Sequence, residues 1–147
     1  MTKIKIKNGI LFLAFLVLPL VADALPFKGQ TIAMSAANRY AVEEGQKIAE
    51  LGGNPIDVAV SMVLTMSVTN PTFAALGGGG FAIIKMGKDV EVLDFRERAP
   101  KATSPDYYKS KLKKASMNGG TAVGVPGLPA GLWELHKKYG KIPWQKL

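Results

Sequence analysis

The sequence predicts an α+β fold in which the elements follow the order helix, helix, hairpin, loop, helix. Two stretches near the start and one near the end combine helix-favouring residues with clear stop positions, namely Gly52, Asn70-Pro71 and Gly140. Between them, two short apolar runs flank a Gly-Lys-Asp turn, which is typical of a β-hairpin. We find no internal repeat and no linker long enough to divide these elements into separate domains.

The first helix is expected at residues 37–51. One side of it carries the small and apolar residues that recur near the helical period, which are Tyr40, Ala41, Gly45, Ile48 and Ala49. The other side carries Glu43, Glu44, Lys47 and Glu50. Gly52 follows and is expected to end the helix, because glycine adopts the left-handed conformation without a steric penalty.

A second helix is expected to start at Asn54, with this residue as the N-cap and Pro55 in the first turn. Asp57 then places a negative charge near the positive end of the helix dipole. The apolar residues that follow surround the helix axis and do not form one stripe, so we expect this helix to be buried. It should end at Asn70-Pro71.

The later elements are less regular. Strands are expected at 81–86 and 90–95, joined by Gly87-Lys88-Asp89, and a loop rich in glycine and proline follows. The last helix is expected from about Pro129 to Tyr139, with Gly140 as its stop. His136 would lie in its final turn as a cation beside the negative end of the dipole.

The N-terminus is predicted to be a signal peptide of residues 1–24. Three lysines precede an apolar stretch at 10–21, and Ala22-Asp23-Ala24 has the small-x-small pattern of a cleavage site. Twelve apolar residues are too few for a helix to span a bilayer, which needs about 20. We therefore expect a periplasmic or secreted product without a stable membrane anchor, consisting of residues 25–147. The formal charge of +8 belongs in part to the export signal.

No catalytic residue is expected in this chain. It contains no cysteine, no Gly-x-Ser-x-Gly elbow and a single histidine, and cleavage after Ala24 would expose Leu25, which has no nucleophilic atom. The hydroxyl groups in the second helix are expected to bond to carbonyls one turn earlier; these are Ser61, Thr65, Ser67 and Thr69. No spacing of histidines and carboxylates suits a metal, so neither a metal nor a cofactor is expected.

Two further patterns have functional alternatives. The glycines at 77–80 resemble a phosphate cradle but lack the following Lys-Ser/Thr, so we expect a tight packing corner that no Cβ atom could enter. The basic stretch from Tyr107 to Lys114 is interpreted as a solvated face. Binding of nucleic acid or an anionic envelope would rest on charge alone, and no nucleic-acid partner is expected.

Arg96 is the candidate substrate-binding residue. In an extended strand it shares one side with Asp94 and Arg98. A guanidinium group is planar and permanently charged, and it matches a carboxylate with two parallel hydrogen bonds. The alternative is an internal ion pair between Asp94 and one of the two arginines. The pattern by itself leaves both open.

Five segments, taken in order, resemble the N-terminal part of the large subunit of γ-glutamyltranspeptidases: Leu51–Val60, Leu76–Phe81, Asp94–Pro100, Gly124–Gly127 and Gly131–Gly140. The resemblance implies part of an N-terminal-nucleophile hydrolase, an αββα sandwich. It implies a precursor that cuts itself before a threonine, which then passes the γ-glutamyl group of glutathione or a related donor to water, amino acids or peptides. It also assigns Arg96 to the α-carboxylate of the donor. The Thr-Thr-His segment of the family is absent, so the chain is expected to be an inactive N-terminal portion that lacks the rest of the large subunit and the small subunit.

Two other interpretations stay open at this stage. A stand-alone exported module could use Arg96 to capture small carboxylates without catalysis. A relative acting on other acyl groups, such as a β-lactam acylase, would carry the same segments, because the residues that discriminate between acyl groups lie outside them.

Overall fold

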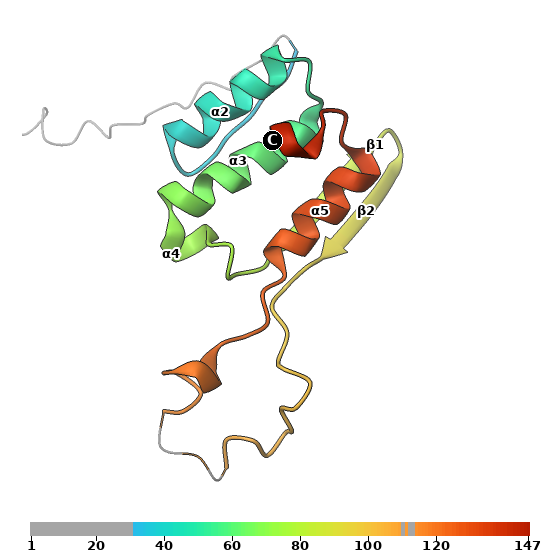
Figure 1. Cartoon of the computed structure of the whole chain (residues 1–147). Helices are drawn as coiled ribbons and strands as arrows, with labels where there is room; N and C mark the ends of the chain where they lie inside the picture. The colour runs from blue at the N-terminus through green and yellow to red at the C-terminus, as the bar shows by residue number, and fades with distance from the viewer. Residues whose placement is uncertain (1–30, 110, 112–113) are drawn as a thin grey trace, which may run out of the picture. The chain divides into compact units, whose positions relative to one another are not determined.

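The computed structural model describes residues 31–109, 111 and 114–147, and the predicted signal peptide lies outside these residues. The elements are α2 (Arg39–Glu50), α3 (Pro55–Thr69), α4 (Pro71–Ala74), β1 (Phe81–Met86), β2 (Asp89–Asp94), the 3₁₀ turn η1 (Gly120–Ala122), α5 (Leu128–Tyr139) and the 3₁₀ turn η2 (Trp144–Lys146). Figure 1 shows α2 alongside α3, and α5 alongside the hairpin. The predicted order of the three long helices and the hairpin is confirmed, whereas the short helix α4 and the two 3₁₀ turns were not predicted.

Helix α2 packs on α3 through the small and apolar face that the sequence predicted. Ala41, Gly45 and Ile48 are buried, and they meet Val58 and Met62 of α3. Gly45 is required there by space, because a Cβ atom on it would lie 2.8 Å from the sulfur of Met62. Gly52 ends the helix with φ of +83°, as expected. Tyr40, which was placed on the same face, is 53% exposed.

Helix α3 starts with the predicted cap. The Asn54 side chain accepts the backbone N–H groups of Ile56 and Asp57, and Asp57 accepts the N–H of Asn54 at 2.9 Å, which forms a reciprocal capping box. The expectation of burial all round holds only in the first half of the helix. Val58, Val60 and Met62 are buried, whereas Val68 is 78% exposed and belongs to neither apolar cluster of the described residues.

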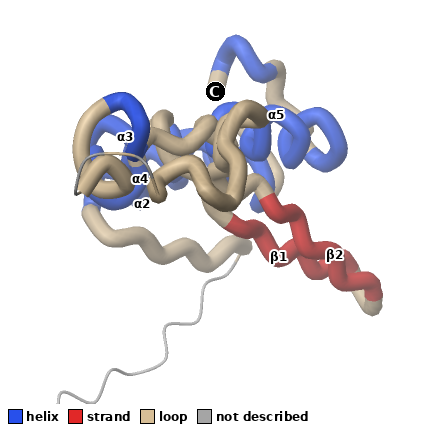
Figure 2. The backbone as a smooth tube through the Cα atoms, turned by 90° about the horizontal axis from the view of Figure 1, so that it is seen from below, coloured by secondary structure: helices blue, strands red, loops and turns tan. Residues whose placement is uncertain are grey.

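The two strands form an antiparallel hairpin, seen clearly in Figure 2, with Ile83 opposite Val92 at its centre. The turn is Gly87-Lys88, so β2 starts and ends one residue earlier than predicted. Gly87 has φ of +62°, which suits a two-residue hairpin turn. Ile84 and its neighbours on one face pack with α3 and α5 in a single cluster; its buried members are Val60, Ile84, Leu128, Leu132 and Leu135.

Helix α5 ends where predicted but by a different mechanism. Gly140 has φ of −68°, so the left-handed stop is wrong. Glycine is needed there because a Cβ atom would lie 2.3 Å from the ring of His136. That ring is largely enclosed, since its side chain is only 11% exposed and lies against Trp133 and Trp144. Its Nε2 donates to the Ile142 carbonyl at 2.7 Å.

A surface ion pair joins α5 to the hairpin. The Lys138 ammonium lies 2.7 and 2.5 Å from the two oxygens of Glu91, and the Tyr139 hydroxyl also contacts that carboxylate. The hydrogen bond from Lys138, followed by that from Tyr139, lowers the pKa of Glu91 from its ordinary value of 4.5. The same contacts raise the pKa of Lys138 above 10.5.

We expect Glu91→Gln to lower stability slightly at pH 7 and not at all in acid. A carboxyl group whose pKa is lowered by folding contributes stability above its unfolded pKa and loses that contribution as the pH falls through the folded pKa. The difference between wild type and variant in urea unfolding should therefore be constant from pH 5 to pH 7 and vanish below the lowered pKa. Glu50→Gln, on the exposed side of α2, is the control. A difference that grows in acid would contradict this assignment.

Candidate functional site

Three segments that are distant in sequence meet around Arg96. Phe95 continues the hairpin beyond β2, since its N–H donates to the Gly80 carbonyl at 3.0 Å. Arg98 pairs in both directions with Val125, at 2.8 and 3.2 Å. The glycine segment is joined to the 124–127 loop as well, because the Gly78 carbonyl accepts the N–H groups of Gly127 and Leu128 at 2.9 Å each. The segments at 77–80, 95–98 and 124–127 thus form one hydrogen-bonded unit.

Glycines on both sides leave no space around the Arg96 backbone. A Cβ atom on Gly79 would lie 2.5 Å from the Phe95 carbonyl oxygen, and one on Gly127 would lie 1.9 Å from the same atom. A Cβ atom on Gly131 of α5 would lie 2.1 Å from the Phe95 ring. The predicted packing corner is confirmed at Gly79 and Gly80, whereas Gly77 has open space where its Cβ would be. The backbone at 95–97 is therefore held in one position by contacts that any larger residue would break.

The Arg96 side chain is exposed and lies between two hollows. One, of about 270 Å³, is lined by Asp94, Arg98 and Glu134 together with the 125–127 loop and α5. The other, of about 220 Å³, is lined by the glycine corner, Phe81 and Glu97. Both include Arg96 in their walls.

The internal ion pair that the sequence left open does not form. One carboxylate oxygen of Asp94 accepts the backbone N–H of Arg96 at 3.0 Å. Asp94 therefore contacts the backbone of Arg96 and forms no ion pair with its guanidinium group. Within the described part of the chain, the ion pairs within 4.0 Å involve neither Arg96 nor Arg98. Arg96 thus keeps a permanent positive charge directed at solvent and at the two hollows.

The hydroxyl groups of α3 are engaged as predicted. Ser61 donates to the Val58 carbonyl at 2.8 Å and Thr65 to the Ser61 carbonyl at 2.9 Å. Ser67 and Thr69 repeat this pattern one turn later. None of these hydroxyls contacts His136, whose Nε2 is directed at Ile142.

Neither a metal site nor a membrane-spanning helix is found in the part of the chain that the structure describes. Residues 31–109, 111 and 114–147 contain no cluster of three or more histidine, cysteine or acidic side chains that could hold an ion. In the same ranges, no helix combines the length and apolar character needed to cross a bilayer.

The basic stretch at 107–114 is stabilised by local contacts. The Tyr108 hydroxyl donates to the Thr121 carbonyl at 2.6 Å, and the Lys111 ammonium lies 4.6 Å from the Tyr107 ring centroid. Lys113, which was part of the predicted pattern, lies outside the described residues. The described lysines of this stretch are exposed.

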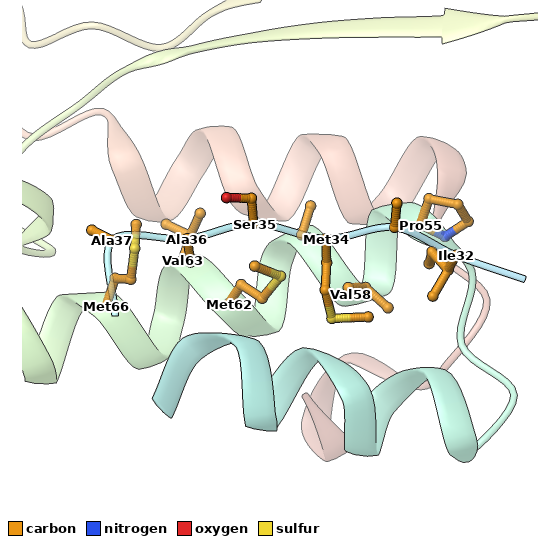
Figure 3. A pocket seen from close by; sticks show the side chains of 12 residues that line it. Ile32, Met34, Ser35, Ala36, Ala37, Pro55, Val58, Met62, Val63 and Met66 are labelled. Carbon is orange, nitrogen blue, oxygen red and sulfur yellow. The ribbon is translucent and has the colours of Figure 1, made fainter. Parts of the chain in front are cut away.

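A larger hollow of about 380 Å³ lies between the segment 32–37 and α3. Figure 3 shows the side chains of Met34, Met62 and Met66 along it. No charged residue lines this hollow, so it lacks a group to orient or activate a polar substrate. We therefore assign the candidate site to Arg96, even though the hollows there are smaller.

Comparison with known proteins shows the family of this chain. The family model for gamma-glutamyltranspeptidase matches residues 41–147. A glutathione hydrolase proenzyme of Pseudomonas aeruginosa is 40% identical over 119 residues, which cover 78% of this chain and 21% of the relative. Glutathione hydrolase 3 of Arabidopsis thaliana is 42% identical over 107 residues, covering 71% of this chain and 17% of the relative. The chain thus spans about a fifth of the length of these curated relatives.

Solved structures that resemble this chain belong to the same family and also identify its fold. The gamma-glutamyltranspeptidase of Helicobacter pylori matches with a TM-score of 0.76 and 36% identity, over 82% of this chain and 36% of that chain. A cephalosporin acylase from Bacillus halodurans matches with a TM-score of 0.65 and 26% identity, over 81% and 25%. The described part is therefore a partial α+β portion of an N-terminal-nucleophile hydrolase fold. This chain belongs to the gamma-glutamyltranspeptidase family.

Proposed function

We propose that this chain supplies the donor-binding wall of an enzyme that transfers or hydrolyses γ-glutamyl groups, with Arg96 holding the α-carboxylate of glutathione or a related donor. The observation that carries the proposal is the unpaired Arg96 side chain on a backbone fixed by Gly79, Gly127 and Gly131. A fixed backbone lowers the entropy that is lost when a ligand is bound, so the guanidinium is prepared for a carboxylate.

The rest of the proposal concerns the longer protein. Residues 25–147 would be the N-terminal portion of the large subunit, preceded by a signal peptide that directs the precursor to the periplasm or the exterior. The rest of the large subunit and the small subunit would complete the pocket. The acyl-accepting threonine would come from that remainder, since the hydroxyls of α3 are bonded to their own helix. On this basis the 147-residue chain binds donor but does not cleave it.

The test is ligand-dependent stability of the purified chain. Glutathione or L-glutamate at ten times its dissociation constant should stabilise the folded state by about 1.4 kcal/mol, a rise of several degrees in the unfolding midpoint. Arg96→Ala should abolish the rise, because the carboxylate loses its bidentate partner. Arg39→Ala removes a different exposed arginine, which lies on the Tyr40 ring, and should keep the rise. An equal rise in the Arg96 and Arg39 variants would refute the assignment.

A second candidate is an acylase acting on β-lactam side chains, favoured by the structural likeness to cephalosporin acylase. Both candidates use Arg96 for a carboxylate, and a γ-glutamyl donor always carries an α-ammonium group beside it, whereas a dicarboxylic acyl side chain without an amino group does not. Titration with glutarate, which lacks that ammonium, separates the two. Stabilisation by glutarate but not by glutamate would favour the acylase.

A further inference from the structure

A second arginine lines the larger of the two hollows beside Arg96. Arg98 belongs to the wall of the hollow of about 270 Å³, together with Arg96, and not to the wall of the smaller one. Its side chain is exposed, and within the described residues it takes part in no ion pair within 4.0 Å. The site therefore holds a second permanent positive charge, for which the binding of an α-carboxylate by Arg96 has no use.

The backbone of Arg98 is also held in place. Its N–H donates to the Val125 carbonyl at 3.2 Å, and its carbonyl accepts the Val125 N–H at 2.8 Å. The 124–127 loop lies close to this segment, because a Cβ atom on Gly124 would lie 3.1 Å from the Cβ of Glu97. Both guanidinium groups thus extend from one anchored stretch of chain.

The two guanidinium groups together suit two carboxylates. Residues two positions apart lie at most about 7 Å from each other along the chain, so Arg96 and Arg98 are within reach of the same ligand. A carboxylate that is bound by one guanidinium group through two parallel hydrogen bonds uses both of its oxygens. A carboxylate held by Arg96 in this way leaves Arg98 available for a second anionic group.

The acidic residues of the same hollow indicate the kind of ligand that carries these groups. Asp94 and Glu134 also line it, and both are exposed and form no ion pair in the described part of the chain. The wall combines two positive and two negative charges, which disfavours a simple anion such as phosphate. A ligand with two carboxylates and an ammonium group matches this mixture. Glutathione has these groups, whereas glutamine and other simple γ-glutamyl amides have a single carboxylate.

We propose that Arg98 binds the carboxylate at the far end of the donor and thereby selects γ-glutamyl peptides over γ-glutamyl amides. Arg96 holds the α-carboxylate, and Arg98 holds the C-terminal carboxylate of the group that leaves when the γ-glutamyl bond is cleaved. This inference rests on the proposed function, because it takes the α-carboxylate at Arg96 as given. It adds a specificity-determining residue that contacts the leaving group and not the γ-glutamyl group.

The experiment compares glutathione with glutathione amide, in which a neutral carboxamide replaces the glycine carboxylate. The shift in the unfolding midpoint of the 147-residue chain gives a dissociation constant for each ligand, and the chain has no cysteine with which the thiol could react. We expect wild type to bind glutathione about fivefold more tightly than the amide. Arg98→Ala should bind the two ligands equally, with the affinity of wild type for the amide. Its ligand-free midpoint should not change, because the pairing with Val125 uses backbone atoms only.

The control variant is Arg39→Ala, which removes an exposed arginine elsewhere and should keep the fivefold ratio. Equal affinities of wild type for the two ligands, or an unchanged ratio in Arg98→Ala, would overturn the inference. Loss of both ligands in Arg96→Ala would still support the proposed function in that case. No midpoint shift with either ligand, or binding that survives Arg96→Ala, would instead overturn the proposed function and this inference with it.

Discussion

Replacement of Asp57 by alanine is expected to lower the free energy of unfolding by roughly 4 kcal/mol, the sum of a lost helix cap and two N–H groups, one buried and one partly buried, left without acceptors. The Asp57 side chain is fully buried. Its two oxygens accept the N–H of Asn54 at 2.9 Å, that of Lys141 at 3.0 and 3.1 Å, and that of Ile142 at 3.3 Å. One carboxylate thus holds the start of α3 against the chain that follows α5.

A second contact strengthens this link and extends the prediction. The Asn54 amide donates to the Tyr139 carbonyl at 2.6 Å, so both cap residues of α3 bind the end of α5. Asp57→Asn retains the volume but replaces one acceptor oxygen with a donor, and we expect about half the loss of the alanine variant. The measurement is urea unfolding monitored by circular dichroism. Asp89→Ala, at an exposed position beside the hairpin turn, should change stability by less than about 0.5 kcal/mol.

Equal midpoints for Asp57→Ala and Asp89→Ala would show that the buried carboxylate is not the link between the two helices. A loss confined to Asp57→Ala, with Asp57→Asn near wild type, would assign the stability to packing volume and not to hydrogen bonding. The intermediate result that we expect requires the carboxylate itself.

Gly127→Ala is expected to be the second most damaging substitution, with a loss of about 3 kcal/mol, the upper end of the usual cost of overpacking. The new methyl group would lie 1.9 Å from the Phe95 carbonyl oxygen and 2.7 Å from its carbon, both backbone atoms that cannot rotate away. Relief requires displacing the 95–97 backbone, so the Arg96 side chain should move as well. The variant should lose both stability and the ligand-dependent rise in the unfolding midpoint.

The glycine run provides a matched pair for the same test. Gly79→Ala faces the Phe95 oxygen at 2.5 Å and the Glu97 nitrogen at 2.7 Å, whereas Gly77→Ala meets nothing within 4 Å. We expect Gly79→Ala to behave like Gly127→Ala, and Gly77→Ala to keep wild-type stability and ligand response. Thermal unfolding with and without glutathione measures both properties. If Gly77→Ala were as damaging as Gly79→Ala, backbone conformation and not space would be the requirement.

Much of the secondary structure was predictable because its causes are local. The Asn54-Pro55 cap, the stop at Gly52 and the bonding of the α3 hydroxyls each depend on residues within four positions of one another. The hairpin was predictable from two apolar runs and a glycine turn, with an error of one residue at β2. Arg96 was found as a candidate because a guanidinium at the end of an apolar strand is unusual. The expectation that Arg96 binds the α-carboxylate of the donor came only from the family resemblance.

The expectations that failed are those that depend on which surfaces come together. The sequence placed His136 in the final turn of the last helix, but it did not indicate that two tryptophans and the 140–142 turn enclose the ring. Val68 follows the apolar pattern of a buried helix, but no neighbouring element reaches it. The importance of Gly131 was missed entirely. Its position in the last helix gives no sign of this requirement, and only the Phe95 ring, which would lie 2.1 Å from a Cβ atom on Gly131, explains why a glycine is there.

The sequence by itself determined the three long helices and the hairpin to within about two residues, the membership of the family and the candidate at Arg96. The tertiary structure alone decided that Arg96 forms no ion pair within the described residues, that glycines from three segments fix its backbone, and that Asp57 joins the start of α3 to Lys141, 84 residues further along the chain. The physical reason is the range of the interactions. Capping and periodicity act within a turn of chain, whereas space and charge pairing at a site depend on how distant elements pack.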